Sequence, residues 1–265
     1  MQKQLGHYTN SKSVLQVNLP EKLPVNEGSA KLVYSSHFLE HIPKPQVMHF
    51  LAVCLRVLKP GGVLRLVLPD LEEMARIYMR FRGAGEHKKA DFLVVEMVDQ
   101  CVRRESGGEL GNLYRHLRGT EDSASRNELI DFVRVRTGEQ LTPLEVSSRQ
   151  HGEGGGAANR SARRFTQRLS RGLQQAWVRL VLLCLPGAFR AQNVSLAGVG
   201  ERHHWLWDFH QLQSVLEEVG FTGVSRWSAN TGSVADFPFY TLDLNAEGRP
   251  RKGMESMYVE AFKPD

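Results

Sequence analysis

The chain has 265 residues, enough for one well-buried α/β domain with an insertion but short for two full domains. Its three cysteines are scattered singly, so neither a disulfide framework nor a paired cysteine metal site is predicted, and a cytoplasmic setting fits best. The first residues lack the apolar core of a signal peptide. The most apolar stretch, residues 178–185, is far shorter than the roughly 20 residues that span a bilayer. We therefore expect no transmembrane segment.

The net charge of +5 arises in one segment. Residues 149–172 contain six arginines and one glutamate, which accounts for the whole excess. The segment also holds a glycine-rich run, so it is typical of a flexible link followed by a basic amphipathic helix. The favoured interpretation is a solvated linker and helix face, with no nucleic acid bound. Contact with RNA or with an anionic membrane surface stays open as the alternative.

The first third of the chain predicts alternating strands and helices. Short apolar runs at residues 14–19, 30–35 and 63–68 predict strands, the second of them buried on both sides. Residues 45–58 place apolar side chains at helical spacing, and Lys-Pro-Gly-Gly at 59–62 ends that helix. Strand, helix, strand with an apolar run in each strand indicates a right-handed crossover in a parallel sheet.

Polar residues follow two of these strands, at the edge where open parallel sheets bind ligands. Ser35, Ser36 and His37 follow one strand, with Glu40 and His41 close behind, and Pro-Asp-Leu-Glu follows the next. For Glu40 and His41 the alternative is a plain helix start, because an acid near a helix amino end is stabilised by the helix dipole.

Two clusters in the later part of the chain are substrate-binding candidates. Glu96 and Asp99, with Gln100 and Arg103, recur at helical spacing and share one polar stripe, which a solvated helix face would also produce. Residues 201–208 gather Glu201, two histidines, two tryptophans and Asp208, and we interpret them as a lid over the ligand.

Asp208 is also suited to cap a helix over residues 209–219. The cluster lacks the His-x-x-x-His and His-Glu-x-x-His spacings, so no metal is expected. A nucleophilic hydrolase is disfavoured because no Gly-x-Ser-x-Gly elbow is present.

Two segments carry a family resemblance. LVYSSHFLEHI at residues 32–42 and FLAVCLRVLKPGGVLRLVLPDLE at residues 50–72 resemble the methyltransferase type 11 group of class I S-adenosylmethionine (SAM)-dependent methyltransferases. Later blocks at 91–110, 132–140, 200–221 and 236–264 resemble the same subfamily in the same order, and only residues 141–199 have no counterpart.

The resemblance implies an α/β, Rossmann-like class I methyltransferase sheet, incomplete at its amino end and carrying a helical insertion. Residues 1–140 would form a partial core, 141–199 the basic linker and insertion, and 200–265 the rest of the core with its lid and closing antiparallel strands.

The activity implied is SAM-dependent methylation of a small-molecule acceptor, a sugar being one option. The implied cofactor-binding residues are Asn18, Leu19, Ser35, Ser36 and His37. The implied catalytic residues are His37 and His203, and the implied substrate-binding residues are Glu96, Asp99, Glu201, Trp205 and Asp208.

The sequence departs from the family at the cofactor turn. Family members have a glycine-rich turn and an acidic residue closing the following strand, and neither is found here. The chain is either a fragment or a product that has lost cofactor binding, so we expect it to bind SAM weakly or not at all. A non-catalytic binding or scaffold protein is the alternative function, and no oligomeric state is predicted.

Overall fold

The computed structural model describes residues 23–119, 123–141, 177, 180–187, 189–190, 194–197 and 201–265. The chain divides into two compact units, Met1–Thr142 with Ala197–Asp265, and Pro143–Leu196, and the fold below is that of the first. The strand expected at 14–19 and the basic segment at 149–172 lie outside the described residues. The predicted domain boundaries stay a prediction.

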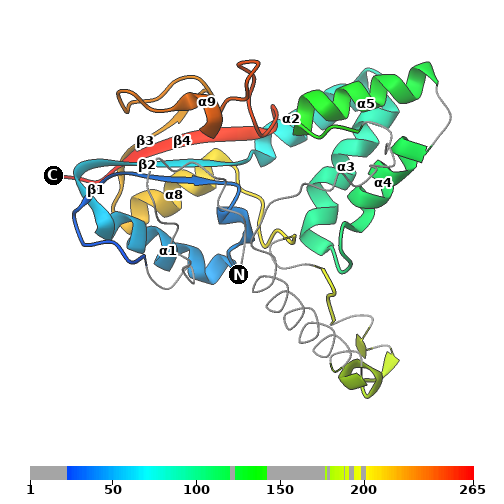
Figure 1. Ribbon diagram of the computed structural model, residues 1–265, viewed down its shortest axis with the longest axis horizontal. Coiled ribbons are helices and arrows are strands. Elements are labelled where there is room, and N and C mark those ends of the chain that lie inside the picture. Colours follow the sequence, from blue (N-terminus) through cyan, green and yellow to red (C-terminus); the bar gives the residue numbers. More distant parts are fainter. Residues whose placement is uncertain are drawn as a thin grey trace, which may run out of the picture. The chain divides into compact units, whose positions relative to one another are not determined.

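The centre of this unit is a four-stranded sheet with the order β1-β2-β4-β3 (Figure 1). The strands are β1 (Ala30–Ser36), β2 (Leu58–Pro69), β3 (Thr222–Trp227) and β4 (Ser256–Phe262). β1 and β2 are parallel, whereas β4 runs antiparallel to β2 on one side and to β3 on the other. The parallel pair and the closing antiparallel strands were both predicted, and the α/β, Rossmann-like fold class is confirmed.

The crossover between β1 and β2 is formed by a short 3-10 helix, η1 (Leu39–His41), and by α1 (Lys44–Val57). The Lys-Pro-Gly-Gly turn lies inside β2 rather than before it, so this strand begins earlier than predicted. β1 was predicted to be buried on both sides, and this is wrong: its residues are mostly half-buried. The reason is that β1 pairs only with β2 among the described strands and forms the edge of that sheet.

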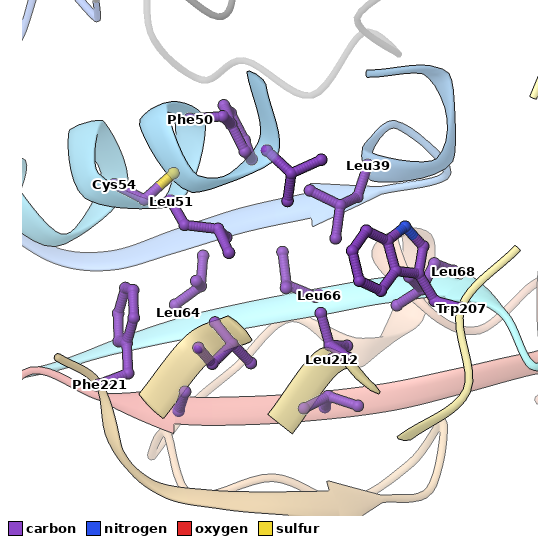
Figure 2. Close-up of a cluster of buried hydrophobic side chains, with 14 of the residues drawn as sticks. Leu39, Phe50, Leu51, Cys54, Leu64, Leu66, Leu68, Trp207, Leu212 and Phe221 are labelled. Carbon is purple, nitrogen blue, oxygen red and sulfur yellow. The ribbon is translucent and has the colours of Figure 1, made fainter. Parts of the chain in front are cut away.

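One face of the sheet is covered by α1 and α8 (Phe209–Val219), which enclose the main apolar core. Figure 2 shows Phe50, Leu51 and Cys54 of α1 pointing toward Leu64 and Leu66 of β2. Alternate residues of β2 face this core because successive strand side chains point to opposite faces. The core fixes the position of β2, and through it the end of β1.

The other face carries a buried ionic group. Arg65 of β2 is fully buried and donates to Asp243 at 2.8 Å and to Glu260 at 2.7 Å. Tyr34 donates its hydroxyl to the same Asp243 at 2.7 Å, and burial followed by the Asp243 charge raises the pKa of Tyr34. A buried guanidinium requires such partners, since an unpaired buried charge is costly. The segment before β4, with α9 (Phe239–Leu242), supplies the cover here (Figure 1).

The chain after β2 is helical. These helices are α2 (Leu71–Gly83), α3 (His87–Val102), α4 (Gly108–Gly119) and α5 (Ala124–Thr137). Phe81, Phe92 and Phe132 pack edge-to-face and join α2, α3 and α5. Among the described residues, no helix combines the length and apolar character needed to cross a membrane.

Candidate functional site

A cavity of about 310 Å³ lies where β1 ends and β4 begins, against α3 and α4. Its wall comprises His37, Glu96, Gln100, Arg103, Gly107, Leu110, Gly111, Tyr114, Thr137, Glu139, Lys252 and Glu255. The volume is at the lower end of the range for small-molecule sites. The parallel strand β1 ends at this cavity, at the edge of the sheet where the sequence predicts ligand binding.

His37 is the cavity residue that comes directly from the sheet. Its φ of 48° is in the left-handed region, and its backbone N–H donates to the carbonyl of Val67 at 2.8 Å. The ring is fixed at both nitrogens, because Nε2 lies 2.9 Å from Ser256 Oγ and Nδ1 lies 3.5 Å from Glu40 Oε1. An imidazole held in this way has a set orientation toward the cavity.

A carboxyl pair forms another part of the wall. Glu96 of α3 accepts from Arg136 Nε of α5 at 2.6 Å, and both side chains are buried. Burial, and then the negative charge of Glu96, raise the pKa of Glu255 well above its usual value. When both carboxyl groups are ionised, neither Glu96 Oε1 nor Glu255 Oε2 accepts a hydrogen bond. A protonated Glu255 donates a hydrogen bond to Glu96.

Asp99 has a structural role. Its carboxylate pairs with Arg103 at 2.6 Å and accepts from the backbone N–H of Glu109 at 2.7 Å and of Leu110 at 3.3 Å, at the start of α4. Both oxygens are therefore used within the protein, and Asp99 is absent from the cavity wall. Asp99 joins α3 to α4, and its contact with substrate stays a prediction.

Residues 201–208, expected to form a lid, pack against the core and against η1. Trp207 is buried in the main core at 1% exposure, and its carbonyl accepts from the Leu71 N–H. The backbone N–H groups of His204 and Trp205 donate to the carbonyl of Glu40 at 2.6 and 3.4 Å. The segment is packed because its large apolar rings gain more from burial than from exposure.

The polar members of that segment have local partners. Glu201 accepts from Ser106 Oγ at 2.8 Å and from the N–H of Gly107 at 3.1 Å. Trp205 donates to Gln211, and Asp208 accepts from the Gln211 N–H at 2.8 Å, as the N-cap of α8. The capping alternative for Asp208 is therefore confirmed. Glu201, Trp205 and Asp208 are not part of this cavity's wall, and their assignment to substrate stays a prediction.

His203 is buried and lies beside η1. Its ring packs edge-on against the His41 ring, with 4.8 Å between the centroids. Its backbone N–H donates to the carbonyl of Gln100 at 2.9 Å. His203 is not part of this cavity's wall, and its catalytic role stays a prediction. It forms a compact group with Glu40 and His41.

The structure thus brings His37 and Glu96 together in one cavity and places Ser35 and Ser36 at the end of β1. Asn18 and Leu19 lie outside the described residues. Four residues of the cavity wall were not predicted from the sequence as site residues: Tyr114, Glu139, Lys252 and Glu255. No local pattern marks these residues, since they come from separate segments that only the tertiary fold brings together.

Comparison with known families gives a match at the amino end of the chain. Residues 1–66, which include β1, η1, α1 and most of β2, match a family described as a methyltransferase domain, Methyltransf_11. The resemblance to the methyltransferase type 11 group is confirmed. This match covers the motifs Ser-His-Phe-Leu-Glu-His and Leu-Lys-Pro-Gly-Gly. A comparison with curated proteins found no match.

Two solved structures are similar to the chain at a low level. The first is the complex between the Haloferax volcanii Trm112 methyltransferase activator and a putative methyltransferase, with 11% identity and a TM-score of 0.31. The second is a putative methyltransferase from Bacillus halodurans C-125, with 13% identity and a TM-score of 0.30. Each covers 92% of this chain, which in turn spans 59% of the first and 69% of the second. Likeness at this level carries no argument, so the fold class rests on the sheet topology.

Proposed function

We propose that this chain is part of a SAM-dependent methyltransferase and that the cavity beside His37 receives a small polar methyl acceptor. The observation that carries the proposal is that a methyltransferase-family segment, residues 1–66, contributes His37 to the cavity wall. The volume of about 310 Å³ and the charged lining favour a small polar molecule over a macromolecular side chain.

The residues present fit the methionine end of SAM. Ser35 and Ser36 end β1 directly before His37, which is part of the cavity wall. SAM carries a cationic sulfonium. The cavity wall contains three carboxyl side chains and two cationic ones, namely Glu96, Glu139 and Glu255, and Arg103 and Lys252. A balanced to weakly acidic wall suits that charge better than a basic wall. When bound, SAM supplies the methyl group.

The protein's own contribution is to position the acceptor and accept its proton. His37 is held by Ser256 and Glu40, so its ring presents a fixed surface to the acceptor. Glu255 is the better candidate for the base. It can act as a base only in its ionised form, and its raised pKa makes that form a stronger proton acceptor than an exposed glutamate; its side chain also reaches the cavity.

The test has a binding arm and a turnover arm. Saturation-transfer NMR with millimolar SAM detects the weak binding that we expect, and S-adenosylhomocysteine should compete. Transfer of a tritiated methyl group from SAM is then screened over small hydroxyl- and amine-bearing acceptors. With an active acceptor, Glu255→Gln should lower kcat by about 10²-fold, well beyond any change in SAM binding. Glu247→Gln, an exposed control, should change neither.

The alternative of a non-catalytic module has a distinct outcome. Absence of saturation transfer at millimolar SAM, together with no methyl transfer in the screen, would contradict the proposal and favour a binding or scaffold protein. Unchanged kcat in Glu255→Gln would leave methyl transfer standing but remove Glu255 from the chemistry.

A further inference from the structure

A buried group of two histidines and one glutamate lies behind the cavity. Glu40 and His41 come from η1, and His203 comes from the segment that precedes α8. One ligand atom from each residue lies within 4.8 Å of the others, and the residues are 0%, 8% and 5% exposed. We propose that Glu40, His41 and His203 form a site for a divalent transition-metal ion, with Zn²⁺ as the best fit.

The tautomer of His41 suits metal binding. Its Nδ1 lies 2.9 Å from the carbonyl oxygen of Arg202, and a carbonyl only accepts, so Nδ1 carries the proton. In the neutral ring the lone pair is then on Nε2, which lies 3.6 Å from Glu40 Oε1. A histidine ligand that donates its other N–H to a carbonyl is the usual arrangement around protein-bound metals.

The distances agree with a shared ion. Zinc–nitrogen and zinc–oxygen bonds of about 2.0–2.2 Å place tetrahedral ligand atoms roughly 3.3–3.6 Å apart. The Glu40–His41 pair already has this spacing. With 4.8 Å as the widest separation in the group, a closure of about 1 Å by side-chain rotation brings all three atoms to bonding distance.

Charge and ligand type decide the class of ion. A fully buried carboxylate is stabilised by a cation, and a dication bound by two neutral imidazoles and one carboxylate leaves a net charge of about +1. Imidazole nitrogen favours Zn²⁺ and its first-row neighbours, whereas Mg²⁺ and Ca²⁺ prefer all-oxygen sites. Three protein ligands also leave a fourth position for water.

The site would connect parts of the chain that flank the cavity. The backbone of residues 203–205 already bonds to Glu40 of η1 and to Gln100 of α3. A metal ion would fix this junction further and would hold Glu40, whose Oε1 lies 3.5 Å from His37 Nδ1. This proposal concerns metal binding alone and does not depend on methyl transfer.

The direct test is a Zn²⁺ titration of the chelator-treated, metal-free chain in competition with a chromophoric chelator. We expect one Zn²⁺ per chain with a dissociation constant of about 1 µM or lower, and a higher Tm in the presence of the ion. Glu40→Gln, His41→Ala and His203→Ala should each weaken binding by about 100-fold or more. His204→Ala is the matched control, since this exposed neighbour lies outside the group, and it should bind like the parent chain.

Cobalt spectroscopy gives a second test, which uses the parent chain and a variant that keeps a metal ligand at position 203. Co²⁺ in the parent chain should give the visible absorption of a four-coordinate nitrogen and oxygen site. His203→Cys keeps a ligand at that position and should add a sulfur-to-cobalt charge-transfer band. The proposal is overturned if the parent chain binds no Zn²⁺, if His204→Ala weakens binding as much as His203→Ala, or if His203→Cys binds Co²⁺ without that band.

Discussion

At the scale of single residues, two neighbouring carboxyl groups in the cavity wall lower the stability of the folded state when both are ionised. Glu96 has Arg136 as a partner, but Glu255 lies against the same carboxylate, and its Oε2 is inaccessible to solvent. Two carboxylates side by side, one buried and the other half-buried, cannot both ionise without a cost in free energy, so one keeps its proton over a wider pH range. Such strain is common at functional sites, and it has a measurable consequence for stability.

We expect Glu255→Gln to stabilise the protein at alkaline pH. The folded-state pKa of Glu255 is raised by burial and by Glu96, so the folded state binds its proton more tightly than the unfolded state does. The stability due to this group is present below the unfolded pKa and is lost as pH rises through the folded pKa. Glutamine keeps the neutral form, so its Tm should exceed that of the parent at pH 9 and match it near pH 4.

Thermal melts across pH 4–9 check this expectation. About 1 kcal/mol corresponds to a shift of roughly 2–4 °C in a protein of this size. Glu247→Gln removes an exposed carboxylate and is the control, for which the difference in Tm should stay near zero. A Glu255→Gln difference that does not grow with pH would show that Glu255 is ionised in the folded state without cost.

Prediction from sequence was uneven among the site residues. His37 lies in the cavity wall, at the end of a strand where ligand-binding residues are expected, and its role stays a prediction. The burial of His203 and Trp207 was not predicted, because a cluster of aromatic and polar side chains has the same sequence pattern whether it covers a ligand or fills a core. The carboxyl pair of Glu96 and Glu255 depends on tertiary contact between distant segments, which spacing within the sequence does not encode.

At the scale of elements, periodicity located the strands and helices well. Helix α1 begins and ends within one residue of the predicted limits, because its apolar spacing and the turn after it are both strong signals. The start of β2 was missed because Lys-Pro-Gly-Gly was interpreted only as a stop signal. In the fold this turn has Gly61 at a φ of 66° and continues into the strand.

We expect Gly62→Ala to destabilise the crossover. A Cβ at Gly62 would lie 2.8 Å from the carbonyl oxygen of Lys59 and 3.2 Å from that of Ala30. Both are backbone atoms, so the strand must shift, at a cost of about 1–3 kcal/mol. Urea denaturation should show this loss as a lower midpoint with an unchanged m-value.

Gly83→Ala provides the matched control. Gly83 ends α2, and a Cβ there would meet nothing within 4 Å. Alanine favours a helix more than glycine does, so this variant should be neutral or slightly more stable. Equal losses in the two variants would show that the close approach of the backbone at Gly62 is not what requires glycine.

At the scale of the whole molecule, order along the chain was sufficient to predict the sheet. β1 and β2 are joined by a helix, so they are parallel, and the last two strands form the antiparallel end. Order along the chain did not indicate that the segment before β4 covers the face opposite α1 and α8. Arg65, Asp243 and Glu260 gave no signal of pairing, since more than 170 residues separate the first two.

The last prediction concerns residues 149–172, which lie outside the described part of the chain. They fall within the unit Pro143–Leu196, separate from the unit that contains the sheet, and they carry six arginines against one glutamate. Deleting them should change the Tm of the sheet-containing unit by less than about 2 °C, because a glycine-rich, highly charged segment has little apolar surface to bury. Calorimetry of the chain with and without these residues measures the change. A fall of several degrees would mean that the segment packs against the core, and the linker interpretation would then be wrong.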